Sequence, residues 1–291
     1  MKSQKILTII IVSYNTKEMT LRCIERVRNT TFPKKDYEVI VVDNASSDGS
    51  AFQIKKMFPD VCVIQNTNNM GFSAGNNIAI RKAEGKYILL LNSDTEVSPE
   101  VFSTMIQFME NHPKAGVSTC KLLLSDGSMD PACHRGFPTP WAACTYMLGF
   151  EKVFPKSHVF GQYHEGYKDM TVPHQIDCPS GAFFLVRREV IDQVGMLDED
   201  YFMYGEDIDW AYRIKEKGWE IWFNPYASIL HLKKQSGRKH ENNSIVKHAN
   251  ANFYTTMKLF YKKYYEKVYP WMVTRLVYFA IDLRISVMKF F

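Results

Sequence analysis

The sequence predicts one α/β domain with a mostly parallel sheet flanked by helices, followed by a C-terminal helical extension. Three observations support this. Short runs of Val, Ile and Leu are typical of strands buried on both faces. These runs alternate with stretches of helical period, as parallel strands joined by crossover helices require. Finally, 291 residues with 46% hydrophobic content suffice for one large domain with an appendage.

Strands and helices are expected to alternate up to residue 91. The expected strands cover residues 6–12, 38–42, 61–65 and 88–91, and the expected helices cover residues 19–28, 52–58 and 73–83. Each strand is apolar and stops abruptly at polar residues. Sheets of this kind bind ligands at the carboxyl ends of their strands, where the strand order reverses. The polar strand ends are therefore the candidate ligand contacts.

The composition of these strand ends limits the ligand. They read Ser13-Tyr14-Asn15, Asp43-Asn44, NTNNMG over residues 66–71, and Asn92-Ser93-Asp94. The first turn, SYNTKE, contains no glycine, which excludes the G-x-G-x-x-G turn of a nicotinamide-binding domain. No Walker lysine pattern occurs either. A nucleotide bound here would need a cation to balance its diphosphate.

Cysteine usage and charge exclude two further classes of protein. The six cysteines form no C-x-x-C pair, so reduced thiols in a cytosolic protein are expected. The net charge of +5 comes from the segment that starts at Lys258, because the rest of the chain contains 29 basic and 29 acidic residues. A nucleic-acid-binding protein should carry its basic surface on the folded domain, so we expect no nucleic-acid partner.

The C-terminal segment from Phe253 repeats aromatic and aliphatic residues at helical spacing with Lys and Arg between them, and Pro270 is expected to divide it into two helices. Residues 271–291 have the length of a membrane span but include Arg275 and Asp282. Two interpretations stay open. The segment lies on an anionic membrane surface, or it packs on the catalytic domain or in a homodimer interface.

Five segments in order and register carry a resemblance to a known family. They are TIIIVSYNTKE, VIVVDNASSDGS, NNMGFSAGNNIAI, YILLLNSD and YFMYGEDIDWAYRIKEKGWEIWFNP. Together they resemble the family 2 glycosyltransferases of the GT-A fold, most of all the rhamnosyltransferase-type branch. The resemblance implies a catalytic domain over residues 1–240, with a nucleotide-sugar half to about residue 115 and an acceptor half from about 116, and a tail over residues 241–291.

The resemblance also implies an activity. The enzyme would move a sugar, with rhamnose as one candidate, from a UDP- or dTDP-linked donor to a hydroxyl of a glycan or polyprenyl-linked acceptor. The reaction would invert the anomeric carbon and serve surface polysaccharide synthesis. We expect a cytoplasmic protein, peripheral on the inner face of the cytoplasmic membrane.

By the same resemblance, the donor lies along the strand ends. The implied donor contacts are Ser13, Tyr14, Asn15, Asp43, Asn44, Gly71, Asn76, Asn92, Ser93 and Asp94. Tyr14 would cover the base, and Gly71 would permit close backbone approach. Asp43 would accept an N–H from a pyrimidine, with a role as a strand-end turn residue as the alternative.

A divalent cation, Mg²⁺ or Mn²⁺, is the cofactor that the resemblance implies. The family usually has Asp-x-Asp where this chain has Asn92-Ser93-Asp94, so Asp94 is the one carboxylate available. His231 is the second protein ligand that the resemblance suggests. The basic residues 233–238 are expected to close over the donor diphosphate, or else to form an ordinary surface loop.

The stretch YGEDIDWAYRIKEKGW contains the catalytic candidates. If a helix begins near Glu206, Asp207 shares a face with Trp210 and points inward, while Asp209 lines up with Arg213 as an ion pair. Resemblance implies that Asp207 is the general base and that Glu206 orients the acceptor or the loop.

Acceptor contacts are expected from Gly181, Trp210 and Asp209. Two other functions stay open. A sugar nucleotidylyltransferase would need a glycine- and basic-rich first loop, which SYNTKE lacks. A catalytically silent carbohydrate- or membrane-binding protein would have no chemical reason to contain Asp94, Asp207 and His231 together.

Overall fold

The computed structural model describes residues 5–233 and 243–290, and their side chains except those of residues 243–248 and 287–290. The strands are β1 Leu7–Ser13, β2 Tyr37–Asp43, β3 Cys62–Gln65, β4 Tyr87–Leu91, β5 Thr95–Val97, β6 Ala115–Leu123, β7 His174–Gln175, β8 Phe183–Arg187 and β9 Glu220–His231. The helices are α1 Lys17–Arg28, α2 Ser50–Met57, α3 Gly71–Ile80, α4 Val101–Asn111, α5 Pro140–Met147, α6 Phe150–Val153, α7 Arg188–Val194, α8 Glu206–Glu216, α9 Asn243–Tyr264 and α10 Trp271–Phe290. Two short 3₁₀ turns cover Lys34–Asp36 and Pro131–Cys133.

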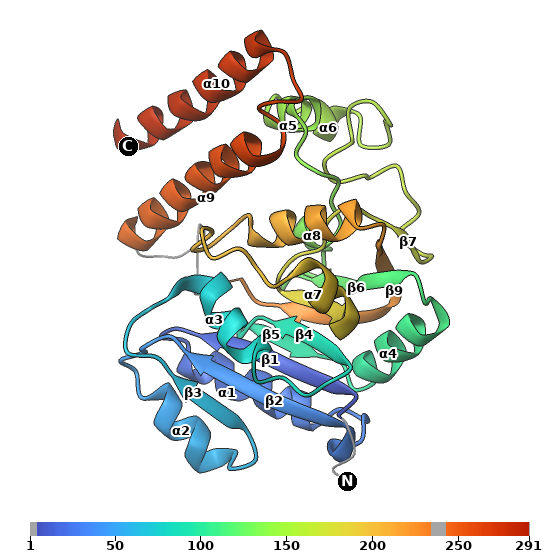
Figure 1. The fold of residues 1–291 in the computed structure, drawn as a ribbon, viewed down its shortest axis with the longest axis vertical. Helices are drawn as coiled ribbons and strands as arrows, with labels where there is room; N and C mark the ends of the chain where they lie inside the picture. The colour runs from blue at the N-terminus through green and yellow to red at the C-terminus, as the bar shows by residue number, and fades with distance from the viewer. Residues whose placement is uncertain (1–4, 234–242, 291) are drawn as a thin grey trace.

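All described strands belong to one sheet, with the order β3-β2-β1-β4-β8-β6-β9-β5 and with β7 paired to β9 (Figure 1). The first four strands are parallel, as the sequence predicts, and each matches its expected range to within a residue or two. The chain leaves β1 for β2 on one side and places β4 on the other. This reversal creates the crevice in which sheets of this type bind ligands.

The half of the sheet beyond β4 is mixed. β8 runs antiparallel to both β4 and β6, whereas β6 and β9 are parallel. The segment between β6 and β8 contains α5 and α6 and otherwise few regular elements, as its prolines predict. This half therefore brings residues from distant parts of the chain to the edge of the crevice.

β4 is fully buried along its length, because its five residues are apolar and it lies between β1 and β8. Its last residue, Leu91, pairs with Phe183 of β8. The next backbone amide, that of Asn92, donates to the carbonyl of Ala182 at 3.2 Å. A rigid central strand thus fixes the position of residues 92–94.

The C-terminal segment forms two helices divided at Pro270, as predicted. α9 packs on α8 through an aromatic cluster in which Tyr212 contacts Phe260 and Tyr264. α10 returns along α9 (Figure 1). Within the described residues, neither these helices nor any other is long and apolar enough to cross a membrane. The expected boundary at residue 240 falls outside the described residues.

Candidate active site

The first candidate centre lies at the end of β4 and is built around Asp94. The β5–β9 pairing places His231 beside it, and the Nε2 atom of His231 lies 3.4 Å from the Asp94 Oδ1 atom. On its other side, His231 Nδ1 contacts the Asp130 carboxylate at 3.0 Å. Lys233 donates to the second oxygen of Asp130 at 2.6 Å. The four side chains therefore form one chain of contacts, in which Asp94, His231 and Asp130 are buried and Lys233 is partly exposed.

Contacts within this centre favour the charged forms of His231 and Asp130. Burial disfavours a charged His231, but hydrogen bonds to Asp130 and Asp94 outweigh it and raise the pKa of His231 to about 9. Burial likewise opposes ionisation of Asp130, yet His231 and Lys233 hold its pKa well below the ordinary value. The residues that follow Lys233 in the predicted basic loop lie outside the described residues.

Several predicted donor contacts surround Asp94 and reach the surface. Asn92 and Ser93 are half-buried, and Tyr14 is 49% exposed. Asn15 is exposed with a φ of 52°, and its amide oxygen accepts the backbone N–H of Ser47 at 2.8 Å. These positions can contact a donor bound at the crevice.

The second candidate centre lies at the start of α8. Helix α8 begins at Glu206 after Gly205, whose φ of 84° lets the chain turn into the helix. An oxygen of the Asp207 carboxylate accepts a hydrogen bond from Arg135 at 2.7 Å and the backbone N–H of Gly181 at 3.3 Å. As the sequence predicts, Asp207 points inward, and these two donors fix its orientation.

Glu206 lies beside Asp207 in a different environment. It is buried, and its Oε2 atom has no hydrogen-bond partner among the described residues. Burial and the neighbouring charge of Asp207 together raise the pKa of Glu206 to about 8. Two like charges in this space are unfavourable, so the pair retains one proton near neutral pH.

The two centres flank the same strand end. Asn92 is hydrogen-bonded to Ala182 across the β4–β8 pair, and Asp94 follows two residues later. On the other strand, Gly181 precedes Ala182 and donates to Asp207. The structure therefore brings the side chains around Asp94 and the adjacent carboxylates of Glu206 and Asp207 to the same end of the β4–β8 pair.

The structure buries the side chains of two predicted acceptor contacts, Trp210 and Asp209. Trp210 is 0% exposed and stacks on Phe184 in the core. Asp209 is also fully buried, and its ion pair with Arg213 is present at 2.8 Å, as predicted. Its other oxygen accepts from Lys263 of α9 at 2.5 Å, so Asp209 attaches the C-terminal helices to α8. Gly181 remains a candidate at the site.

The structure also buries two predicted donor contacts at the ends of β1 and β2. Ser13 is fully buried, and its hydroxyl lies 2.9 Å from that of Thr20 in α1. Asp43 is fully buried as well, and its carboxylate accepts from the backbone N–H of Ser46 and the hydroxyl of Ser50. These contacts are those of the strand-end turn residue that the sequence offered as the alternative role of Asp43.

The remaining predicted donor residues connect loops to one another. Asn44 is buried and donates to the carbonyl of Gly71 at 2.9 Å. The close approach that Gly71 permits is to the chain itself, since a Cβ atom there would lie 2.4 Å from the Phe202 carbonyl oxygen. Asn76 is buried and donates to Phe72. The contacts that the structure shows for Asn44, Gly71 and Asn76 are thus contacts within the chain, and their role as donor contacts stays a prediction.

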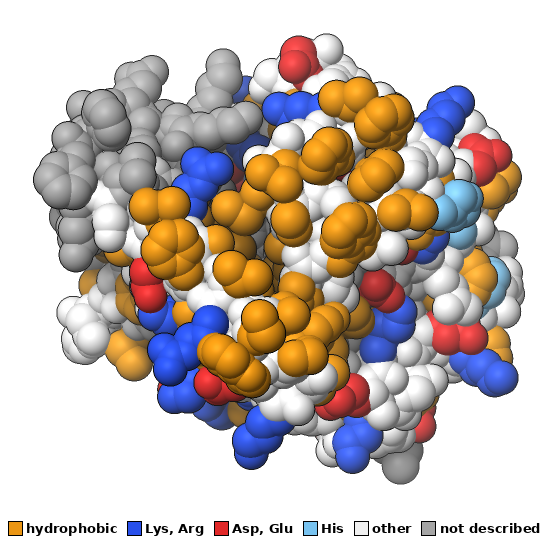
Figure 2. Space-filling view, turned by 90° about the horizontal axis from the view of Figure 1, so that it is seen from above, with side chains coloured by type: hydrophobic (Ala, Val, Ile, Leu, Met, Phe, Trp, Pro, Cys, Tyr) orange, Lys and Arg blue, Asp and Glu red, His pale blue; other side chains and the backbone are white. Residues whose placement is uncertain are grey.

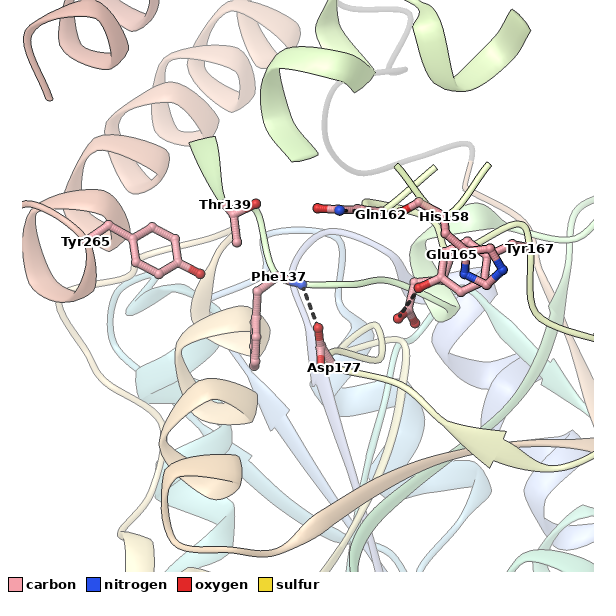
Figure 3. A pocket seen from close by; sticks show the side chains of 8 residues that line it. All are labelled: Phe137, Thr139, His158, Gln162, Glu165, Tyr167, Asp177 and Tyr265. Atoms are coloured by element: carbon pink, nitrogen blue, oxygen red, sulfur yellow. Dashed lines mark hydrogen bonds between the residues drawn. The ribbon is translucent and has the colours of Figure 1, made fainter. Parts of the chain in front are cut away.

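A cavity of about 250 Å³ lies on the acceptor side of the sheet, beside the C-terminal end of α9 (Figure 3). Its lining residues are Phe137, Thr139, His158, Gln162, Glu165, Tyr167, Asp177 and Tyr265. The backbone N–H of Phe137 donates to the Asp177 side chain, and the backbone N–H of Asp177 donates to the carbonyl of Arg135 at 3.1 Å. Arg135 in turn contacts Asp207, so these bonds connect the cavity lining to Asp207.

Sequence reasoning missed two residues of the site, Arg135 and Asp130. Both lie in the irregular segment after β6, and each contacts a partner about 70 to 100 residues away in the chain. A local pattern carries no signal for such pairs. Within the part of the chain that the structure describes, no three His, Cys, Asp or Glu side chains form a group that could hold a metal ion.

The family model for "Glycosyl transferase family 2" matches residues 8–195, so the chain belongs to that family. It is similar to N-acetylglucosaminyl-diphospho-decaprenol L-rhamnosyltransferase of Mycobacterium tuberculosis, with 23% identity over 85% of this chain and 83% of the relative. It is also similar to rhamnosyltransferase WbbL of Escherichia coli, with 27% identity over 84% and 90%.

The fold agrees with this membership. A mannosyltransferase from Pyrobaculum calidifontis, solved in complex with GDP-Man and Mn²⁺, superposes with a TM-score of 0.63 at 14% identity over 97% of this chain and 72% of its own. The protein therefore has the predicted GT-A fold, and it is a glycosyltransferase of the rhamnosyltransferase-like branch.

Proposed function

We propose that this enzyme transfers a sugar, with rhamnose as the first candidate, from a UDP- or dTDP-linked donor to a hydroxyl of a lipid-linked glycan, with inversion. The observation that supports the proposal best is the meeting of two centres at the β4–β8 strand end, one around Asp94 and one around Asp207. Inverting transfer needs a leaving-group site and a base on opposite sides of one carbon. Two centres that flank one crevice meet that need.

The first centre suits a divalent cation. Asp94 and His231 face each other at 3.4 Å, and Asp130 contacts the far nitrogen of the imidazole, an arrangement common behind metal-binding histidines. Because its pKa is raised to about 9, His231 would have to release its proton to become the second ligand of a cation. Two protein ligands leave room for donor phosphates and water, which is how Mg²⁺ is usually bound at phosphate sites. When bound, the cation would neutralise charge on the leaving diphosphate. The choice between Mg²⁺ and Mn²⁺ stays open.

The second centre supplies the base. Arg135 and the backbone N–H of Gly181 hold one oxygen of Asp207. The other oxygen accepts the backbone N–H of Ile208 at 2.8 Å, and its remaining lone pair would receive the proton from the acceptor hydroxyl. Glu206, neutral near pH 7 because of its raised pKa, adds no second negative charge beside the base. The acceptor oxygen then attacks the anomeric carbon as the bond to the diphosphate breaks.

The acceptor side is proposed to handle a polyprenyl-linked glycan at the inner face of the cytoplasmic membrane. Two observations support this. The relative from Mycobacterium tuberculosis has a decaprenol carrier in its name, and the C-terminal helices of this chain are basic and rich in exposed apolar side chains. A surface polysaccharide is the expected product.

The test is a panel of UDP-, dTDP- and GDP-linked sugars incubated with the purified protein and a synthetic polyprenyl-diphosphate N-acetylglucosamine acceptor. We expect nucleoside diphosphate release with one donor, its loss with EDTA, its recovery with Mg²⁺ or Mn²⁺, and an NMR coupling constant that reports inversion. Retention of configuration, or full activity after exhaustive metal removal, would refute the mechanism.

A further inference from the structure

Exposed apolar side chains concentrate in two segments that are far apart in the sequence. Of the twenty large hydrophobic side chains that are exposed among the described residues, thirteen lie in residues 141–159 and 268–283. They are Trp141, Tyr146, Leu148, Phe150, Val153, Phe154 and Val159 in the first segment, and Val268, Trp271, Met272, Leu276, Phe279 and Leu283 in the second. Scattered exposed apolar residues need no explanation, but a concentration of this kind marks an interaction site.

The two segments share one end of the molecule. α5, α6 and α10 lie together at the end farthest from α2 (Figure 1). Figure 2 looks down on that end, where hydrophobic side chains cover most of the centre of the visible face. The cavity of Figure 3 joins the segments from below, because Thr139 at the start of α5, His158 and Tyr265 after α9 line it together. We call these thirteen side chains the apolar face.

We propose that the apolar face docks on an anionic lipid bilayer, with α5–α6 and α10 contributing one half each. On α10, Met272, Leu276, Phe279 and Leu283 recur at helical spacing and point away from the protein, whereas Ile281 packs inward. No described helix is apolar and long enough to cross a bilayer. A helix of this character lies in the interface with its apolar side in the acyl boundary.

The charges around the apolar face select an anionic surface. Six exposed cations on or next to these segments form no ion pair within the described residues: Lys152, Lys156, Lys262, Lys267, Arg275 and Arg284. Lys263 of α9 is also exposed, but it pairs with Asp198 and Asp209. The acids nearby are largely engaged: Asp282 pairs with Lys258, and Glu151 is buried against His164. The apolar face therefore has a positive rim, which anionic headgroups would neutralise.

The same charges disfavour a second copy of the chain as the occupant. A symmetric dimer across this face would bring identical basic residues together, because a two-fold interface pairs a surface patch with itself. Like charges so juxtaposed are repulsive unless acids are interleaved. Few acids are exposed there. An anionic bilayer would therefore neutralise the basic residues around the apolar face, whereas a second copy of the chain would not.

Membrane docking would also orient the site, a step that rests on the proposed function. The cavity beside Tyr265 is lined by Thr139 at the start of α5, and its lining residue Asp177 connects through Arg135 to Asp207. A glycan whose carrier stays in the bilayer would therefore approach the base from this side. The donor crevice around Asp94 would stay open to the cytoplasm.

The test measures co-sedimentation of the full-length protein with vesicles of phosphatidylcholine that contain phosphatidylglycerol, and with vesicles of phosphatidylcholine alone. One double variant, Leu148→Glu with Val153→Glu, changes only the α5–α6 half. Another, Leu276→Glu with Phe279→Glu, changes only the α10 half. The matched control is Phe52→Glu on α2, where the side chain is 72% exposed at the opposite end of the molecule.

We expect each double variant to lower affinity for the anionic vesicles at least about tenfold, and the control to bind like the wild type. Binding should weaken with added salt and with phosphatidylcholine alone. All altered side chains are exposed, so thermal unfolding should stay unchanged and exclude misfolding. Quenching by brominated lipid is compared between a Trp271→Phe variant and a Trp141→Phe, Trp271→Phe double variant, because Trp210, Trp219 and Trp222 remain in both. The difference between the two reports on Trp141 and hence on the α5–α6 half.

Wild-type vesicle binding by the α5–α6 variant, or no quenching of Trp141, would overturn the two-part face. A protein that binds no vesicles but forms dimers that both double variants abolish would assign the face to a second copy instead. Neither donor nor acceptor is present in these measurements. An inactive protein that still binds vesicles would therefore refute the proposed reaction and leave this inference standing.

Discussion

The Asp94 centre and the Glu206–Asp207 centre contain the same kinds of acidic side chain, yet their surroundings give them opposite properties. Around Asp94, His231 and Lys233 supply positive charge, and the pKa of Asp130 falls well below its ordinary value. Around Glu206, burial beside another carboxylate raises the pKa to about 8. One centre is built to stay charged, and the other is built to hold a proton.

The difference teaches how one fold separates two tasks in a single crevice. Holding a cation and a diphosphate requires fixed charge, whereas accepting a proton from a hydroxyl requires a base whose neighbours do not compete for it. Sequence alone shows only acids at strand and helix ends. Their division of labour depends on where Arg135, Lys233 and His231 lie relative to them.

The largest expected effect is on the proton-accepting centre. Asp207→Asn removes the base while its neutral amide can still fill the same space, so kcat should fall by about 10²–10⁴-fold with little change in the donor KM. Steady-state nucleoside diphosphate release measures this. Asp192→Asn, an exposed position on α7, is the control and should leave kcat unchanged. Wild-type turnover by Asp207→Asn would show that Asp207 is not the base, and the two centres would then not have separate tasks.

Asp209, two residues after Asp207 on α8, should contribute to stability and not to catalysis. Asp209→Asn leaves Arg213 and Lys263 without their buried anion and should lower the free energy of unfolding by about 3–5 kcal/mol. Chemical denaturation measures the loss, and kcat well below the melting temperature should stay unchanged. The exposed Asp200→Asn serves as the control. A variant with normal stability but no turnover would move Asp209 into the catalytic centre.

In the proposed cation site around Asp94, a change at Asp130 should lower the affinity for the metal. Asp130→Asn weakens the support of His231, so the metal concentration for half-maximal activity should rise about 10–100-fold, with kcat recovered at saturating metal. Metal titration of the activity measures it, with exposed Asp126→Asn as the control. If kcat fell instead and metal dependence did not move, Asp130 would not act through the cation.

The smallest expected effect is a change in the pH dependence of stability. Between pH 4.5 and about 8, native Glu206 holds a proton that the unfolded chain has released. The native state then binds more protons, so the free energy of unfolding falls as pH rises through this window. Glu206→Gln should lack this contribution and give a flatter profile. Parallel profiles for the wild type and the variant would show that Glu206 ionises normally.

Local features of this protein follow from the amino-acid sequence. The apolar runs fixed the first four strands, Pro270 fixed the break between the last two helices, and helical spacing fixed the inward direction of Asp207 and the pairing of Asp209 with Arg213. Each of these features depends on residues that are close together in the sequence. Hydrophobic periodicity and turn-forming residues such as proline therefore predict them. The GT-A fold followed from five such motifs in register.

Tertiary structure alone decided which polar residues reach the crevice. Ser13 and Asp43 end strands as the sequence shows, but their own loops cover them, while Arg135 enters the site from an irregular segment. It also decided that residues 141–159 meet the C-terminal helices at one apolar face. Contacts between residues tens to more than a hundred positions apart depend on the packing of the whole chain. Periodicity and composition contain no record of that packing.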